Sequence, residues 1–493
     1  MIISHKHKFI FLKTRKTAGT SVQIALSGVC DIDNDIITGS NIKYDVVDES
    51  NAAGWNMDKF ITNHPHPPIQ DVKNAVPEWN DYFKFAFVRN PYEIVVSRYH
   101  WDIKGKGNQS TSIDGFREWI KGYCTEGGTY WQDEQWRYIS IDATTAVDYI
   151  GRYETLNEDF DHICEVLNIT TDELGFQKSG YRDKTHYSKY YDENAISLVQ
   201  QYFAKDISLF DYKFEFEKEF ELVDRKILID QSIANAKNIN GPSIIKVPDF
   251  VKDKLGNYYL YFADHTGQHI KMAYSDHIEG PYTLLKGGTL QLEETPCNKH
   301  IASPDVHIKD DEIVMYYHGD IDSGQYTFES YSADGINFIS YDKVLTPFYH
   351  REFEYLGDTY ALCKNKNENS QLYKKEGFKY KLLYELLPGS RHTAVHVEDN
   401  ILYIVYSLVG ESPERLYVCK IVDWEIDSNY ELARPNLIWE GADQPLVTSH
   451  YGMALGFNNE LRDPYIYSEN NQLYLLYSYG GESGISFGKL KKI

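Results

Sequence analysis

The stretch Phe9-Ile-Phe-Leu-Lys-Thr-Arg-Lys-Thr-Ala-Gly-Thr-Ser-Val22 changes abruptly from apolar residues to small, hydroxyl and basic ones. The stretch Phe85-Ala-Phe-Val-Arg-Asn-Pro-Tyr-Glu-Ile-Val-Val-Ser97 shows a similar change. Their apolar runs predict buried strands over residues 8–12 and 83–88. Helical spacing of apolar residues predicts helices over 21–26, 94–99, 156–167 and 193–203. Because strands and helices alternate, we expect an α/β domain with a parallel sheet over residues 1–218.

Both stretches carry anion-binding groups where a strand gives way to a helix. Amides at a helix N-terminus and nearby hydroxyls can cradle an anion, and Lys13, Arg15 and Lys16 add positive charge to the first loop. Arg89 can hold a phosphate in fork geometry, and Ser97 can donate a hydroxyl. Two separate anion sites predict a ligand phosphorylated at two places. The triphosphate-binding pattern GxxxxGKS/T is absent.

These motifs resemble those of sulfotransferases that use 3′-phosphoadenosine 5′-phosphosulfate (PAPS). Residues 13–21, KTRKTAGTS, resemble the 5′-phosphosulfate loop, and residues 87–99, FVRNPYEIVVSRY, resemble the 3′-phosphate motif. Residues 150–160 and 202–212 are similar to segments of the carbohydrate sulfotransferases. The resemblance covers about residues 1–215. It implies a P-loop-like α/β domain, PAPS as the sulfate donor and a carbohydrate as the acceptor.

The resemblance also implies roles for single residues. Lys16 is expected to act in catalysis by stabilising the leaving phosphate, and Arg89 and Ser97 are expected to bind the 3′-phosphate. The residues expected at the 5′-phosphosulfate are Arg15, Lys16, Thr17, Ala18, Gly19, Thr20 and Ser21. Many relatives have glycine where this chain has Ala18, and arginine where it has Ile94. Neither difference removes a charged group that contacts the phosphosulfate.

The acceptor hydroxyl needs a general base. The segment Thr-Asn-His-Pro-His at residues 62–66 resembles the histidine segment that supplies the base in some uronyl sulfotransferases. Since an imidazole with a pKa near neutrality suits this work, His64 is the expected base. The alternatives are His66 and a carboxylate such as Glu93 or Asp102.

Overall charge and apolar content limit the partners and the location. The chain of 493 residues has 50 Lys and Arg against 73 Asp and Glu, a net charge of −23. This charge argues against nucleic acid or an anionic membrane as the main partner. The six cysteines are scattered, and no apolar run approaches the ~18 residues of a membrane span. We therefore expect a cytoplasmic protein without a membrane anchor.

The second half of the chain contains a repeat. Tyrosine-rich strand cores recur five times after polar or glycine turns, at a period typical of propeller blades. The cores are residues 258–262, 313–317, 359–363, 402–406 and 473–477. This pattern predicts an all-β five-bladed propeller over residues 239–493, after a linker over 219–238. A β-sandwich is the alternative, although it has no reason to repeat a motif at this period.

The residues that enter the innermost strands of a propeller point into its central funnel. The predicted funnel residues are His265, Asp305, His318, His392, Arg462, Asp463 and Glu482. Residues 259–267 and 273–281 resemble the five-bladed propellers of glycoside hydrolase families 43 and 32. Those hydrolases usually place their basic aspartate where this chain has Ser243, which favours glycan binding over hydrolysis. No compact ligand motif predicts a metal site.

The sequence thus predicts a sulfotransferase that moves a sulfuryl group from PAPS to a carbohydrate hydroxyl, leaving 3′-phosphoadenosine 5′-phosphate (PAP). The propeller would bind or trim the glycan. One alternative is a glycoside hydrolase with an accessory domain that docks a nucleotide or a sulfated sugar. Another is a carbohydrate-binding protein with two inactive domains.

Overall fold

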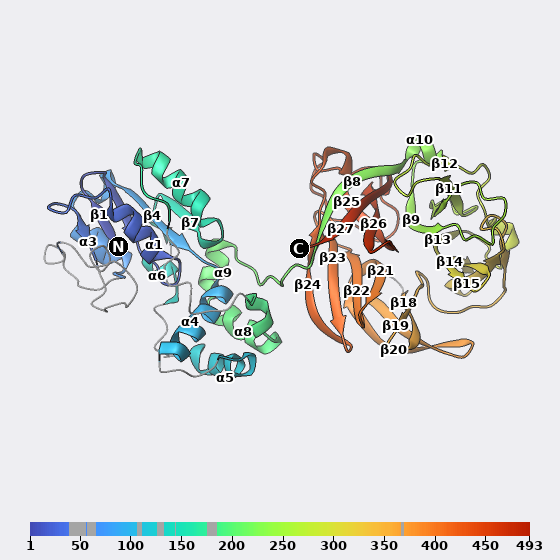
Figure 1. Ribbon diagram of the computed structural model, residues 1–493, viewed down its shortest axis with the longest axis horizontal. Helices are drawn as coiled ribbons and strands as arrows, with labels where there is room; N and C mark the ends of the chain where they lie inside the picture. The colour runs from blue at the N-terminus through green and yellow to red at the C-terminus, as the bar shows by residue number, and fades with distance from the viewer. Residues whose placement is uncertain are drawn as a thin grey trace. The chain divides into compact units, whose positions relative to one another are not determined.

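The computed structural model describes residues 1–38, 56, 66–105, 111–125, 133–142, 144–174, 185–365 and 369–493. The chain folds into two compact units, Met1–Glu217 and Lys218–Ile493 (Figure 1). No helix in the described parts of the chain is both long and apolar enough to cross a membrane.

The first unit is built on a mixed five-stranded sheet. In spatial order its strands are β3 (Ile36–Ile37), β1 (Ile2–Ser4), β2 (Phe9–Leu12), β4 (Phe83–Val88) and β7 (Tyr149–Arg152). The pairs β2–β4 and β4–β7 are parallel, whereas β1 runs antiparallel to both β2 and β3. The prediction of a parallel sheet is therefore wrong for β1. The four residues between β1 and β2 are too few for a crossover and can only form a hairpin.

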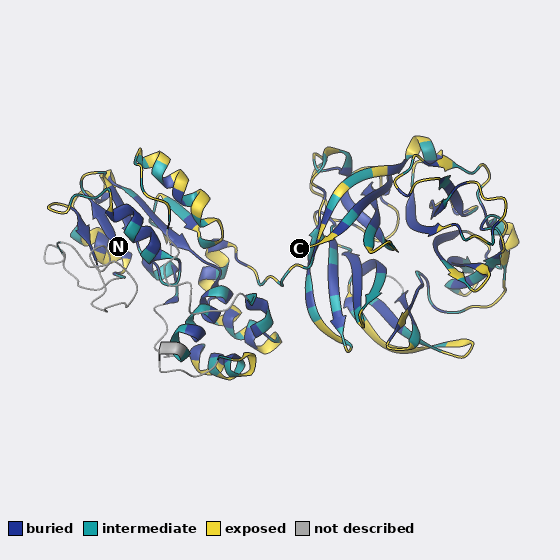
Figure 2. Cartoon of the chain, viewed as in Figure 1, coloured by how far each residue is buried: buried dark blue, intermediate teal, exposed yellow. Residues whose placement is uncertain are grey.

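Helices cover both faces of this sheet. Phe9 and Phe11 of β2 pack against residues of α1 and α7, while Ile10 and Leu12 pack against residues of α3 and α6. Burial on both faces explains why β2 is a continuous apolar run and why Lys84 alone interrupts the apolar residues of β4 (Figure 2). The helices are α1 (Gly19–Ser27), α3 (Ile69–Ala75), α4 (Pro91–Gly105), α5 (Ile113–Tyr123), α6 (Trp136–Ile139), α7 (Leu156–Leu167), α8 (Glu193–Tyr202) and α9 (Ala204–Phe210).

The second unit consists of five four-stranded antiparallel sheets, which confirms the five-bladed propeller. The innermost strands are β9 (Asn240–Lys246), β13 (Ile301–Lys309), β17 (Arg351–Tyr355), β21 (Ser390–Glu398) and β25 (Phe457–Glu469). The second strands, which contain the five tyrosine-rich cores, are β10 (Tyr258–Ala263), β14 (Glu312–Ile321), β18 (Asp358–Asn365), β22 (Ile401–Leu408) and β26 (Gln472–Gly481). The third strands are β11 (Lys271–Ser275), β15 (Gly324–Ser332), β19 (Asn369–Glu376), β23 (Leu416–Val422) and β27 (Gly484–Lys492).

The outermost strands include one from the start of the unit. They are β12 (Thr283–Leu284), β16 (Ile339–Ser340), β20 (Lys379–Pro388), β24 (Glu425–Ala433) and β8 (Phe220–Asp230). Strand β8 pairs with β27 near the end of the chain and so closes the ring. The range 219–238, expected to be a linker, thus holds β8 and the short helix α10 (Gln231–Ala234). The alternating charges of β8 concealed an edge strand that is apolar on only one face.

We predict that residues 218–493 fold alone and that residues 239–493 do not form a stable propeller. Without β8, the buried carboxylate of Glu440 loses Arg225, its ion-pair partner, and retains only neutral donors, the hydroxyl of Tyr477 and two backbone amides. Breaking a buried ion pair in this way costs about 3–5 kcal/mol. Thermal unfolding of the two fragments, followed by circular dichroism, measures the difference. Equal midpoints would show that β8 is dispensable.

Candidate functional site

The candidate site of the first unit lies where β2 and β4 end. These strands pair in parallel, with Phe9 opposite Phe83 and Leu12 opposite Ala86, so their carboxyl ends share one edge of the sheet. The loop of residues 13–18 follows β2, and Arg89 follows β4. Helices α1 and α4 begin directly after them. The two predicted anion-binding stretches therefore meet at this edge, a usual place for ligands in α/β folds.

The loop after β2 is held by its own hydroxyls. The buried Thr14 donates a hydrogen bond to the carbonyl oxygen of Phe87 in β4. The hydroxyl of Thr17 lies 2.7 Å from that of Thr14 and is buried as well. Lys16 and Ala18 have φ values of 63° and 58°, in the left-handed region that glycine prefers. The backbone thus turns tightly before α1, with Thr17 directed into the loop.

Arg89 connects the second strand end to this loop. Its Nη1 donates to the carbonyl oxygen of Lys16 at 2.9 Å, and its guanidinium lies 3.8 Å from the centre of the Tyr153 ring. Its Nη2 forms an ion pair with Glu93 at 2.8 Å. The predicted alternative base Glu93 is therefore a partner of Arg89.

One face of α4 runs beside the loop. Glu93, Ser97 and Trp101 are spaced four residues apart and so share this face. Glu93 holds Arg89, and the Nζ atom of Lys16 lies 4.5 Å from the centre of the Trp101 ring. Ser97 lies between these two contacts along the helix, on the side of the loop.

Asp102, the other carboxylate considered as a base, forms an ion pair with Arg98 at 3.2 Å. Both residues belong to α4. Asp102 is therefore the counter-ion of Arg98.

The histidine segment reaches the loop through His66. His66 Nδ1 lies 2.8 Å from the carbonyl oxygen of Lys13, which can only accept, so Nδ1 carries the proton and Nε2 the lone pair. Burial, with help from Lys13, lowers the pKa of His66 well below its usual value. The ring is therefore neutral at physiological pH. His64, the expected base, lies outside the described residues.

Several residues of this site were missed by the sequence analysis. Trp101 stacks on Lys16, and Tyr153 stacks on Arg89. The buried Asp133 interacts electrostatically with Arg15 and Lys16, although burial raises its pKa. Tyr153 belongs to the segment 150–160 that resembles carbohydrate sulfotransferases, so that segment was a usable signal. No motif marked Trp101 or Asp133.

Residues 1–213 match the model of the sulfotransferase family. The first unit is therefore a sulfotransferase-family domain. The chain is also 29% identical over 310 residues to an uncharacterized protein of Acanthamoeba polyphaga mimivirus, covering 52% of this chain and 85% of that protein.

Solved structures similar to this chain include family-43 glycoside hydrolases. One is a thermostable enzyme with 14% identity and a TM-score of 0.38, covering 53% of this chain and 92% of that one. Another is the GH43_1 enzyme from Xanthomonas citri complexed with xylose, with 12% identity and a TM-score of 0.38, covering 55% and 90%.

A second polar site lies at the axis of the propeller, among the innermost strands of its blades. Four of these strands carry a register shift near their start, and Gly241, Ser303 and Asp463 adopt left-handed backbone conformations there. Each of these three residues precedes a proline. The shifts redirect the side chains that follow toward the neighbouring blades.

Those following side chains bond across the blades. The Ser243 hydroxyl accepts from the Val306 amide at 2.9 Å, and Arg351 Nη1 lies 3.5 Å from Asp305. Arg351 Nε donates to the carbonyl oxygen of Thr393 at 3.2 Å. Asp305 is thus part of a buried network that links the four blades whose innermost strands are β9, β13, β17 and β21.

The other predicted funnel residues fall into two groups. His392 Nδ1 bonds Asp463, and the His392 ring lies 3.8 Å from that of Tyr349, which also contacts His318 at 4.7 Å. Separately, Glu482 lies 3.1 Å from His265 Nε2 and 3.4 Å from Arg462 Nη1. Tyr349, which the sequence analysis missed, belongs to the first group through its ring contacts. It also interacts electrostatically with Glu482 and Arg462 of the second group.

Two of the buried carboxylates at the axis, Asp305 and Glu482, are ionised. Burial alone would raise the pKa of Asp305, but His307 and Arg351 hold it at about 2. The pKa of Glu482 is also lowered, by His265 and Arg462 against the effect of burial. Glycoside hydrolysis needs a carboxylic acid that stays protonated, and these two residues do not supply one. Among the described residues, no group of His, Cys, Asp and Glu is arranged to hold a metal ion.

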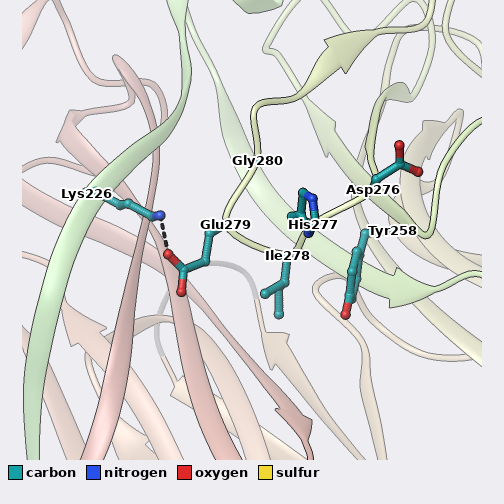
Figure 3. A pocket seen from close by; sticks show the side chains of 7 residues that line it. All are labelled: Lys226, Tyr258, Asp276, His277, Ile278, Glu279 and Gly280. Carbon is teal, nitrogen blue, oxygen red and sulfur yellow. Dashed lines mark hydrogen bonds and ion pairs between the residues drawn. The ribbon is translucent and has the colours of Figure 1, made fainter.

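A separate pocket of 470 Å³ lies on the propeller between β8 and the turn after β11 (Figure 3). Its lining residues are Lys226, Tyr258, Asp276, His277, Ile278, Glu279 and Gly280. Lys226 and Glu279 pair with each other at 2.5 Å across it. It contains none of the predicted site residues.

We predict that Ala18→Gly stabilises the sulfotransferase domain, because glycine adopts the left-handed conformation without the steric cost that alanine bears. The greater chain entropy of glycine in the unfolded state opposes part of this effect. The net gain is about 0.5–1 kcal/mol in the free energy of unfolding. Ala25→Gly, inside α1, is the matched control and should destabilise by about 1 kcal/mol or more. Denaturant unfolding measures both. Loss of stability in both variants would contradict the strained turn.

Proposed function

We propose that this protein transfers a sulfuryl group from PAPS to a hydroxyl of a carbohydrate that the propeller binds. The observation that carries the proposal is the meeting of two basic anion-binding stretches at the shared edge of β2 and β4. One stretch ends in the N-terminus of α1, and the other supplies Arg89. A nucleotide with one anionic group at its 5′ position and another at its 3′ position matches such a pair.

The donor set suits this nucleotide. Arg89 is buried, and among the described residues its Nε has no hydrogen-bond partner, which leaves donor capacity for a phosphate. Lys13, Arg15 and Lys16 supply positive charge at the loop. Bound PAPS would supply the sulfuryl group, held by residues 15–21 at its 5′ end and by Arg89 and Ser97 at its 3′ end. Lys16 would stabilise the charge that develops as the group is transferred.

The propeller supports a carbohydrate acceptor. Its axis gathers histidine, arginine, tyrosine and carboxylate side chains, which donate and accept hydrogen bonds as sugar hydroxyls require. The low pKa of Asp305 and Glu482 favours binding over hydrolysis. Glycan capture by the propeller is therefore the role we propose.

The main test of the proposal is transfer of radiolabelled sulfate from PAPS to a panel of glycans. Lys16→Ala should lower the rate about 100- to 1000-fold, because it removes charge stabilisation in the transition state. Its thermal unfolding should match that of the wild type. Lys73→Ala, on the exposed side of α3, is the matched control and should keep full activity. Wild-type turnover by Lys16→Ala would refute the proposal.

The pH dependence of transfer distinguishes the two histidines that can serve as the base. If His66 is the base, its lowered pKa keeps it unprotonated, and the rate should stay constant from pH 6 to 8. This is the result we expect, and His66→Ala should then abolish transfer. The alternative result is a rate that falls as the pH is lowered, with a midpoint near the usual pKa of histidine, about 6.5. If this pH dependence is lost in His64→Ala, the base is His64.

For the propeller we predict that Asp463→Asn raises the acceptor KM about tenfold with little change in kcat, the sign of lost uniform binding. The matched control is Asp399→Asn, in an exposed turn. The wild type should release no sugar from chromogenic glycosides. Sugar release that Asp463→Asn abolishes would instead establish a glycoside hydrolase.

A further inference from the structure

The backbone of Arg89 is held by a side-chain amide. Gln135 Oε1 accepts from the Arg89 amide at 2.7 Å, and Gln135 Nε2 donates to the Arg89 carbonyl oxygen at 2.8 Å. Gln135 is fully buried. Its amide thus bonds the strand end as the backbone of a neighbouring strand would.

Gln135 is in turn fixed by Asp206 of α9. The two carboxylate oxygens of Asp206 accept from the backbone amides of Gln135 and Trp136, each at 2.8 Å. Asp206 is fully buried, and burial raises its pKa to about 7, so an ionised Asp206 is costly to maintain. Its two bonds fix the backbone of Gln135 and Trp136 at the start of α6.

The next residue, Asn90, is held in the same way. Glu154 Oε1 accepts from the Asn90 amide at 2.8 Å, and the hydroxyl of Tyr212 donates to Glu154 Oε2 at 3.0 Å. Asp206 and Tyr212 both lie in the segment 202–212. This segment therefore supports two consecutive residues at the end of β4.

We infer that Gln135, held by Asp206, is a positioning residue that presents Arg89 to the 3′-phosphate of the nucleotide. The inference rests on the proposed binding of PAPS. It goes further by assigning part of the selectivity for a 3′-phosphate to Gln135, which acts through Arg89. Arg89 needs this support because its guanidinium is shared between the Lys16 carbonyl and Glu93, so a small backbone shift misdirects it.

The test compares PAP with adenosine 5′-monophosphate, which differs only in lacking the 3′-phosphate. Calorimetry on the full chain gives the dissociation constant of each ligand, and the selectivity ratio is that of adenosine 5′-monophosphate divided by that of PAP. Arg89→Ala should reduce this ratio roughly ten- to a hundredfold, the value of a charge-assisted contact. Gln135→Met, which removes both bonds at similar size, should reduce it about three- to tenfold. The matched control Gln70→Met, exposed on α3, should leave the ratio unchanged.

The double variant shows whether Gln135 acts through Arg89. If it does, Arg89→Ala combined with Gln135→Met should have the ratio of Arg89→Ala alone. Additive effects, or a wild-type ratio in folded Gln135→Met, would overturn the inference. If Gln135→Met does not fold, Asp206→Asn, which keeps one acceptor, replaces it, and an unchanged ratio again overturns the inference. An unchanged ratio in Arg89→Ala would instead refute the proposed 3′-phosphate site.

Discussion

The parallel pairing of β2 with β4 is the constraint on which the sulfotransferase domain depends. Phe9 opposite Phe83 and Leu12 opposite Ala86 bring two loops, separated by about seventy residues of chain, to one edge of the sheet. Thr14, just after β2, then donates a hydrogen bond to Phe87 of β4, and Arg89 donates one to Lys16. A slip of one residue would turn Phe9 and Phe11 from the side of α1 and α7 to the side of α3 and α6 and would separate these contacts.

Three residues that are distant in sequence converge on Arg89. Tyr153 stacks on its guanidinium, Gln135 holds its backbone, and Asp206 holds Gln135. The two weaker resemblances seen in the sequence, over 150–160 and 202–212, supply Tyr153 and Asp206. Their common physical role is to support a strand end that has lost its sheet neighbours.

Periodicity predicted most of the fold because burial dictates it. The range of α7 was predicted without error, and five tyrosine-rich cores matched the second strands of five blades. Strand β8 was missed because a half-exposed edge strand has the composition of a linker. The antiparallel β1 depends on a short hairpin that no apolar pattern marks. Gln135 and Asp133 gave no signal, since single buried polar residues are recognisable only by their three-dimensional partners.

The two polar sites differ in how their charges are balanced. At the axis of the propeller, Arg391 pairs with Glu414 at 2.7 Å and Arg462 pairs with Glu460 at 2.5 Å, so the arginines are matched by carboxylates. The sulfotransferase loop instead concentrates lysine and arginine with few acids. Matched charges offer hydrogen bonds without a net field, which suits a neutral polyol, whereas surplus positive charge suits a nucleotide with two anionic groups. The contrast in charge thus favours a division in which one domain binds the anionic donor and the other binds the sugar.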